Sequence, residues 1–278
     1  MDEIFETLLR SPESHVPGSP PYLKLRDEAR RKITALFGGE AAIDQPFWKF
    51  GELAFPYHRM GAISSLDLFG LDELIIFAFY HANRGRYRNV ADIGANIGLH
   101  SIMLGRCGCT VRCYEPDPAH LARLRENLDR NGIATVTPIQ AAVSIRSGRT
   151  SFVRVLGNTT GSHLAGAKDS YGETEEFEVA LVDVSSIYSE SDLVKMDAEG
   201  HEAALLSVLD PQQAEKVDIV AEVGSEANAS AIFGDLSAKG INMFSQKIGW
   251  GKVCRLEDMP TSHREGSLFV TMKDSVPW

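Results

Sequence analysis

From residue 88 onward, short strand-like runs alternate with longer segments of helical spacing. NVADI, TVRCYEP, DLVKMD and KVDIVAEV are rich in apolar residues, and helical patterns such as PAHLARLRENLDRNG separate them. Because helices that connect such strands make right-handed crossovers, the strands form a mostly parallel sheet. INMFSQKI and SLFVTMK have no evident helix between them, which predicts a closing hairpin and an antiparallel strand. The alternation therefore predicts a doubly wound α/β fold.

The first 85 residues have a different pattern. EIFETLLR and LKLRDEARRKITALF have helical spacing, and the proline-containing SPESHVPGSPP separates them. LDLFGLDELIIFAFYHA, residues 66–82, is a further apolar helical segment. We predict an N-terminal helical extension over residues 1–85, which binds a substrate or forms a homodimer interface. A domain built on the sheet follows over residues 86–278.

Composition and charge limit the classes of partner. The chain has 28 Lys and Arg against 38 Asp and Glu, a formal net charge of -10, which argues against a nucleic-acid partner. It has no apolar run of about 18 residues and no apolar signal core at its start, which predicts no membrane span and a cytoplasmic location. Cys107, Cys109 and Cys113 lack the knuckle spacing of zinc sites and are interpreted as reduced structural cysteines.

A glycine-containing segment, DIGANIG, follows the strand NVADI. Asp92 ends the strand, Gly94 permits a tight turn, and Gly98 permits a close approach of helix and ligand. Asn96 stands where a dinucleotide-binding loop has its middle glycine, so a nucleotide without a pyrophosphate fits this loop better. A tight strand-to-helix turn that binds nothing is the alternative interpretation.

An acidic residue ends the next strand. Glu115 follows Asp92 by about 20 positions, the spacing at which an acid accepts hydrogen bonds from ribose hydroxyls. Pro116 and Pro118 cannot continue the strand. We therefore expect Asp92 and Glu115 to hold opposite ends of one nucleotide ligand. A solvated acid at the strand end is the alternative.

A third polar segment, VKMDAEGHE, crosses from a strand into a helix. Lys195 and Asp197 point to one face of the strand. Because an unpaired charge inside a central strand is costly, we expect Lys195 to have a carboxylate partner. Glu199, His201 and Glu202 follow at the start of the helix. These side chains therefore reach the carboxyl edge of the sheet, where ligands of doubly wound folds bind.

Together, DIGANIG, YEPDP and VKMDAEGHE resemble the signatures of FkbM-type S-adenosylmethionine-dependent methyltransferases. The resemblance covers about residues 88–272, and residues 1–85 have no counterpart in it. It implies a class I, Rossmann-like catalytic domain with a seven-stranded sheet that has one antiparallel strand. It also implies S-adenosyl-L-methionine as the methyl donor and O-methylation of a small molecule or glycan, such as a sugar, a polyketide or a lipid-linked metabolite.

The resemblance also implies roles for individual residues. It places Asp92 near the methionine end of the cofactor, and IQAAV beside the adenine. His201 stands at a variable position of the third motif. The cofactor-binding residues that it implies are Asp92, Gly94, Asn96, Gly98, Glu115, Gln140, Ala141 and Asp197. The residues that match the third motif are Lys195, Asp197, Glu199, Gly200 and Glu202.

Methylation of an alcohol requires a group that takes the hydroxyl proton, because an alcohol is about as weak an acid as water. We expect the catalytic residues among Lys195, Asp197, Glu199 and His201. Other candidate bases are His100, in the helix after DIGANIG, and His163, which lies with Asn158 and Ser162 in LGNTTGSHL. A divalent cation held by Asp197, Glu199 and Glu222 is not favoured, and no metal ligand is assigned.

Two other classes of function remain open. An NAD-dependent oxidoreductase also has an acid after a glycine-rich loop, but Asn96 and the lack of a second mononucleotide-binding half disfavour it. A non-catalytic nucleotide-binding module is the other alternative, because no motif demonstrates turnover.

Overall fold

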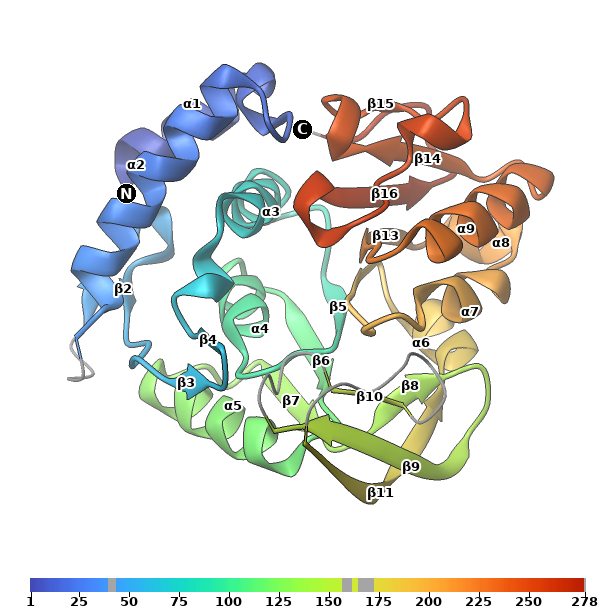
Figure 1. The fold of residues 1–278 in the computed structure, drawn as a ribbon, viewed down its shortest axis with the longest axis horizontal. Helices are drawn as coiled ribbons and strands as arrows, with labels where there is room; N and C mark the ends of the chain where they lie inside the picture. The colour runs from blue at the N-terminus through green and yellow to red at the C-terminus, as the bar shows by residue number, and fades with distance from the viewer. Residues whose placement is uncertain (40–43, 157–161, 165–172, 278) are drawn as a thin grey trace.

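A computed structural model describes residues 1–39, 44–156, 162–164 and 173–277 of the chain. An eight-stranded sheet lies at its centre (Figure 1). The strand order is β15-β14-β16-β13-β12-β5-β6-β7. From β13 to β7 all neighbours are parallel, and β16 is antiparallel to both β13 and β14. The predicted mostly parallel sheet is confirmed, but it has eight strands instead of the expected seven, because the short β15 adds an edge strand antiparallel to β14. The bounds are β5 (Asn89–Ile93), β6 (Thr110–Tyr114), β7 (Val136–Ile139), β12 (Leu193–Met196), β13 (Asp218–Glu222), β14 (Asn242–Ser245), β15 (Gly251–Lys252) and β16 (Ser267–Thr271).

Helices cover both faces of this sheet, because alternate residues of each buried strand point to opposite sides. Val90 and Val111 pack in one apolar cluster with helices α3 (Leu71–Ala82), α4 (Leu99–Arg106) and α5 (Pro118–Arg130). Ala91, which follows Val90 in β5, and its register partner Val194 in β12 pack in a second apolar cluster on the opposite face. The helices of that second face are α6 (Val184–Glu190), α7 (Glu202–Ser207), α8 (Pro211–Ala214) and α9 (Glu226–Ala238).

The N-terminal segment shares one hydrophobic core with the sheet. Phe5 and Phe37 belong to the same buried cluster as Val90. As predicted, its main elements are helices. The segment 66–82 is not one helix, however, because Gly70 separates the short turn η3 from α3. The two-residue strand pairs were not predicted, because such short elements carry no periodicity. The elements are α1 (Asp2–Arg10), η1 (Pro12–His15), α2 (Pro20–Phe37), β1 (Gln45–Pro46), η2 (Trp48–Phe50), β2 (Glu52–Leu53), β3 (Arg59–Met60), β4 (Ile63–Ser64) and η3 (Asp67–Phe69).

A second sheet of order β10-β9-β11-β8 lies beside the end of β7 (Figure 1). VTPIQAAV reads as one strand in the sequence, but its chain leaves the main sheet at Gln140 and enters β8. The second sheet consists of β8 (Ala142–Ser144), β9 (Gly148–Val155), β10 (His163–Leu164) and β11 (Thr174–Asp183). Three short turns near the C-terminus, η5 (Gln246–Ile248), η6 (Leu256–Asp258) and η7 (His263–Glu265), complete the fold. Among the described residues, no helix is long and apolar enough to cross a membrane.

Candidate active site

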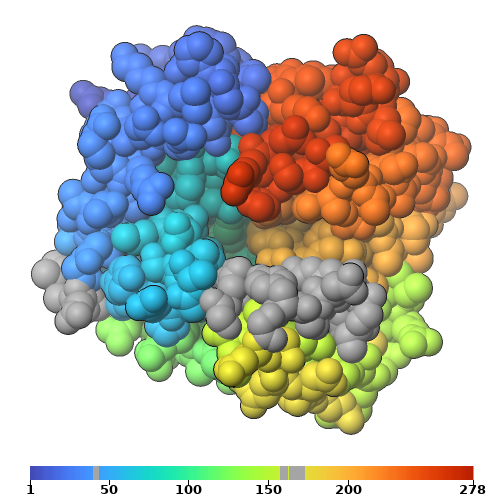
Figure 2. All heavy atoms as spheres, in the orientation of Figure 1, coloured from blue at the N-terminus to red at the C-terminus, as the bar shows by residue number. Residues whose placement is uncertain are grey.

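A cavity of about 770 Å³ opens at the carboxyl ends of the parallel strands. Figure 2 shows this face of the molecule hollowed at its centre, between the N-terminal part in cyan and the C-terminal part in red and orange. Its lining includes Gly94, Glu115 and Asp197, and also Glu73 and Glu222. The predicted rim of polar strand ends is therefore a continuous concave site.

The glycine-containing loop packs directly against the end of β12. Gly94 has φ +75°, and a Cβ atom there would lie 1.8 Å from the carbonyl oxygen of Asp197. Gly98 has φ +91° and is the N-cap of α4, where a Cβ would meet Leu124 of α5 at 2.9 Å. Gly94 therefore permits contact between the two loops of the cavity floor. Gly98 permits close packing of two helices and does not line the cavity.

Asn96 has φ 51° and contributes both its backbone and its side chain to the site. Its N–H donates to Oε2 of Glu115 at 2.8 Å. Its side-chain Oδ1 is buried and accepts no hydrogen bond from the part of the chain that is described. A buried acceptor without a donor is costly, so a ligand that donates a hydrogen bond here is favoured.

Asp92 lies beneath the cavity and does not line it. It is 0% exposed, Oδ2 accepts a hydrogen bond from Ser101 Oγ at 2.6 Å, and Oδ1 is 3.9 Å from Nζ of Lys195. The two residues are register partners on β5 and β12, which places their side chains on the same face of the sheet. Asp92 therefore supports the floor of the site through Lys195.

Glu115, at the end of β6, is 5% exposed and lines the cavity. Its oxygens accept hydrogen bonds from the backbone N–H groups of Asn96 at 2.8 Å and Asp117 at 2.9 Å. Burial raises the pKa of Glu115 to about 8, and the carboxylates of Asp117 and Asp197 add to the shift, although the two N–H donors oppose it. The acid is thus fixed at the cavity wall.

Lys195 is the buried cation of the site, and the predicted carboxylate partner is confirmed. Its Nζ lies 3.5 Å from Oδ2 of Asp197, 3.9 Å from Oδ1 of Asp92 and 3.4 Å from the carbonyl oxygen of Gly94. Burial lowers the pKa of Lys195, but Asp197 and Asp92 more than offset it, so its pKa is above the ordinary value. Lys195 therefore remains a cation that joins the glycine loop to the carboxylates.

The third motif forms a tight loop around a buried acid. Glu199 has φ 49° and lines the cavity, and Gly200 has φ 101°. Glu202 is 2% exposed and accepts hydrogen bonds from the N–H groups of Ala198 at 2.9 Å and Gly200 at 3.1 Å. Glu202 also accepts from the side-chain amide of Asn228 at 2.7 Å. It therefore holds the loop that presents Glu199.

The histidines predicted as candidate bases occupy different surroundings. His201 lines the cavity, its Nε2 lies 3.3 Å from Oγ of Ser144, and burial lowers its pKa. Both ring nitrogens of His100 are hydrogen-bonded, to Tyr80 and to Glu73. Ser162 is buried and its Oγ accepts from the N–H of Val155 at 3.1 Å. Asn158 and the side chain of His163 lie outside the described part of the structure.

Glu73 was not predicted and is a prominent polar group on the N-terminal side of the cavity. Its Oε2 lies 2.8 Å from Nε2 of His100, and Nδ1 of His100 lies 3.0 Å from the hydroxyl of Tyr80. Burial raises the pKa of Glu73, but His100 and Lys195 outweigh it, so its pKa is below the ordinary value. The apolar helix pattern of residues 66–82 contained Glu73, but no motif distinguished it.

Glu222, which the sequence placed with Asp197 and Glu199 as a disfavoured cation site, ends β13 and lines the cavity. Burial raises its pKa well above the ordinary value, and the carboxylates of Asp197 and Glu73 raise it further. Within the described residues, no group of three His, Cys, Asp or Glu side chains is arranged to hold a metal ion.

Of the two residues predicted beside the adenine, one lies in the cavity wall and the other at the protein surface. Ala141 is 1% exposed and lines the cavity, whereas Gln140 is exposed and does not. The orphaned Oδ1 of Asn96, the wall acid Glu115 and the apolar Ala141 suit a ligand with hydroxyl, amine and adenine groups. The residues present therefore fit an adenosyl cofactor.

Comparison with solved structures finds distant similarity. Cofactor-bound Rv0187 from MTB is 15% identical, with 97% of this chain and 95% of that chain covered and a TM-score of 0.40. The precorrin-6y C5,15-methyltransferase from Geobacter metallireducens GS-15 is 13% identical, covering 68% and 82%, with a TM-score of 0.37. Monomeric WbdD is 12% identical at a TM-score of 0.40, and the match spans 72% of this chain but 40% of that one.

Comparison with family models gives a match over more than half of the chain. No curated protein sequence matches. The model of the methyltransferase FkbM domain matches residues 92–235, which begin at Asp92, contain all of the third motif and end within α9. This chain belongs to the FkbM methyltransferase family.

Proposed function

We propose that the protein is an S-adenosylmethionine-dependent O-methyltransferase that methylates a hydroxyl group of a small molecule or glycan. The observation that carries this proposal is the single cavity of about 770 Å³, which joins the glycine-loop side to the side of α3. Its volume lies in the range of small-molecule sites, and it has room for a donor and an acceptor side by side.

The glycine-loop side is the proposed donor site. Here Glu115 would accept hydrogen bonds from the ribose hydroxyls, Asn96 Oδ1 would accept one from the donor, and Ala141 would contact the adenine. When bound, S-adenosylmethionine supplies a methyl group on a sulfonium. Asp197 faces this part of the cavity, and its negative charge favours a cationic ligand. Asp92 acts from beneath the floor, through Lys195.

The proposed catalytic roles follow from the ionisable side chains that line the cavity. Methyl transfer would require the acceptor oxygen to lie in line with the methyl carbon, and the cavity would contribute by holding the two ligands in that geometry. Asp197, Glu199 and the imidazole of His201 line the cavity and are the groups proposed to take the hydroxyl proton. Lys195 retains its proton and fixes the position of Asp197.

The N-terminal segment is the proposed acceptor side. Ile63, Leu68 and Ile76 line the cavity beside the carboxylates of Asp67 and Glu73. This mixture of apolar and hydrogen-bond-accepting groups suits a hydroxylated acceptor. It supports the prediction that residues 1–85 bind the acceptor.

Calorimetric titration with S-adenosylmethionine and, separately, with NAD tests the donor assignment. We expect binding of S-adenosylmethionine and no binding of NAD. Release of S-adenosylhomocysteine on incubation with a panel of sugars, polyketides and lipid-linked alcohols then tests turnover. Binding of NAD alone would support the oxidoreductase alternative, and donor binding without turnover on any acceptor would support the non-catalytic module.

The pKa of Glu115 gives a pH-dependent prediction for donor binding. The ionised carboxylate accepts hydrogen bonds from ribose hydroxyls better than the protonated group does. Because its pKa is raised to about 8, Glu115 is mostly protonated at lower pH. The free-energy cost of removing that proton weakens binding there. We expect the affinity for S-adenosylhomocysteine to rise by up to about tenfold per pH unit until pH 8. Titrations between about pH 6 and pH 9 measure it, and a Glu115→Gln variant with an unchanged slope would assign the pH dependence to another group.

A further inference from the structure

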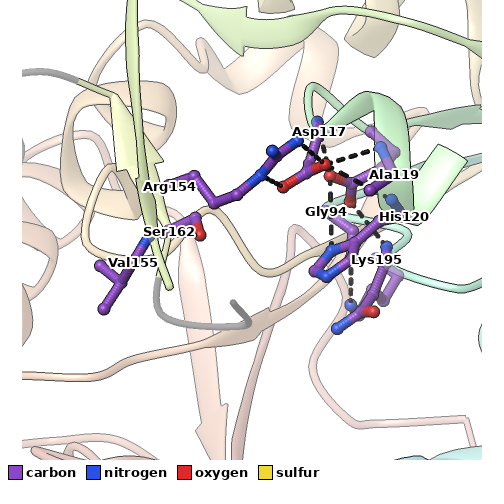
Figure 3. A network of polar contacts seen from close by, with 10 residues as sticks. Gly94, Asp117, Ala119, His120, Arg154, Val155, Ser162 and Lys195 are labelled. Atoms are coloured by element: carbon purple, nitrogen blue, oxygen red, sulfur yellow. Dashed lines mark hydrogen bonds and ion pairs between the residues drawn. The ribbon is translucent and has the colours of Figure 1, made fainter. Parts of the chain in front are cut away.

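Arg154 reaches from the second sheet to the turn that follows β6 (Figure 3). Its Nε donates to Oδ2 of Asp117 at 2.6 Å, and its Nη2 donates to Oδ1 at 2.6 Å. Asp117 is 1% exposed, so this bidentate pair is shielded from solvent on the carboxylate side. The contact joins two elements that are 37 residues apart in the chain.

The guanidinium of Arg154 is held by further contacts from the neighbouring strand. Glu175 of β11 accepts a hydrogen bond from Nη1 at 2.7 Å. The ring of Phe177, also on β11, lies 4.9 Å from the guanidinium carbon, and Phe177 packs on Phe152. These contacts hold the guanidinium of Arg154 in the orientation in which it bonds Asp117, so the contact is preorganised.

Asp117 in turn fixes Glu115, the proposed ribose-binding acid. The N–H of Asp117 donates to Oε1 of Glu115 at 2.9 Å. The carboxylate of Asp117 accepts from the N–H groups of Ala119 at 2.8 Å and His120 at 3.4 Å, so it caps α5. Burial raises the pKa of Asp117, but Arg154 and the other partners outweigh this and lower it. Without Arg154, the buried carboxylate would lose its compensating cation.

The second sheet also forms part of the cavity wall. Phe152 lies two positions before Arg154 on β9, on the same face of the strand, and lines the cavity. Ala142 and Val143 of β8 line it too, as does Ser162, next to β10. The strand that carries Arg154 therefore touches both the turn at Glu115 and the cavity.

We propose that Arg154 is a positioning residue of the donor site, which holds Glu115 against the ribose by fixing Asp117, and that the second sheet is thereby part of the adenosine-binding surface. This proposal rests on the proposed donor. Arg154 does not contact the reacting atoms, so its loss weakens donor binding and leaves the chemistry of the bound complex in place.

Calorimetric titration of the full chain with S-adenosylhomocysteine tests the proposal. We expect Arg154→Met to weaken binding about tenfold, the effect of losing one hydrogen bond to a charged group. Arg149→Met is the matched control, because Arg149 lies on the same strand and pairs with Glu178 of β11, but is exposed. We expect this control to bind within about twofold of the wild type.

Two further measurements separate positioning from general damage. Because Arg154 acts through Asp117, the double variant Asp117→Asn/Arg154→Met should bind no more weakly than Asp117→Asn alone. In Arg154→Met, Asp117 loses its cation. The negative charge of Asp117 is then uncompensated and raises the pKa of Glu115 further. Asp197 and His120 also face Glu115. The loss of Arg154 removes a cation that lowers the pKa of His120, but burial still lowers that pKa, so His120 stays neutral near pH 8, where binding reaches its plateau. The pH at which binding reaches its plateau should therefore move upward, whereas general damage would lower affinity equally at each pH.

The outcomes distinguish this proposal from the proposed function. If the wild type does not bind S-adenosylhomocysteine, both are overturned. If the wild type binds and Arg154→Met binds equally well, or if the double variant shows additive losses, only the role of Arg154 is overturned. Should Arg154→Met fail to fold, Arg154→Lys carries the test, because an ammonium keeps the charge but cannot bond both carboxylate oxygens in a fork. Equal binding by Arg154→Lys and the wild type would then overturn it.

Discussion

Gly94→Ala is expected to abolish binding of S-adenosylhomocysteine and to lower the free energy of unfolding by about 2–5 kcal/mol. A Cβ at this position would lie 1.8 Å from the carbonyl oxygen of Asp197, and backbone atoms cannot move aside as a side chain can. The φ of +75° adds strain for any residue with a Cβ. The glycine loop and the end of β12 must therefore separate, and the donor side of the cavity loses its floor.

Calorimetry with S-adenosylhomocysteine and thermal unfolding measure these two effects. Gly132→Ala is the matched control, because Gly132 also has a positive φ, +63°, but among the described atoms none lies within 4 Å of an added Cβ. We expect that variant to lose about 1 kcal/mol and to bind normally. A Gly94→Ala protein that binds as tightly as the Gly132→Ala protein would show that the close approach of the two loops is not needed for the site.

Local patterns were sufficient for the elements that surround the site. NVADI is β5 to the residue, because an apolar run that ends at a glycine turn is a local signal. Glu115 lies at the cavity wall as expected, since the strand end and the acid are adjacent in sequence. The partner of Lys195 could also be predicted, because a charge in a central strand requires one. The identity of the partner could not, since it depends on the register of β12 against β5.

Contacts between distant segments were beyond the sequence. Glu73 lies in a helix that was predicted, but which side of that helix faces the cavity depends on its packing against α4. VTPIQAAV contains no glycine that marks a break, so the chain's passage from one sheet to the other at Gln140 was not predicted. Arg154 carried no motif, and its contact with Asp117 exists only because the second sheet folds back over the turn.

Lys195→Met is expected to be the most destabilising replacement of a charged residue at the site, with a loss of about 3–5 kcal/mol. Lys195 is 9% exposed, and its removal leaves Asp92, which is 0% exposed, without its cation. Chemical denaturation measures the loss. Lys252→Met, at an exposed position of β15, is the control and should change stability by less than about 0.5 kcal/mol.

The double variant Lys195→Met/Asp92→Asn tests whether this loss comes from the unpaired carboxylate. Asparagine keeps a side-chain acceptor for Ser101 but carries no charge, so the double variant should be more stable than Lys195→Met alone. The pKa of Lys195 is raised in the folded protein, so its contribution is complete below its ordinary pKa, about 10.4, and is lost only as pH rises through the folded value. Lys195 also lowers the pKa of Glu73 and of Glu222, so in Lys195→Met these buried acids bind protons more readily. The difference between wild type and Lys195→Met should therefore grow as the pH rises from about 6 to about 9. A difference that shrinks as the pH rises through that range would mean that Lys195 does not neutralise the buried carboxylates. Equal stability of the single and double variants would mean that the loss arises from packing alone.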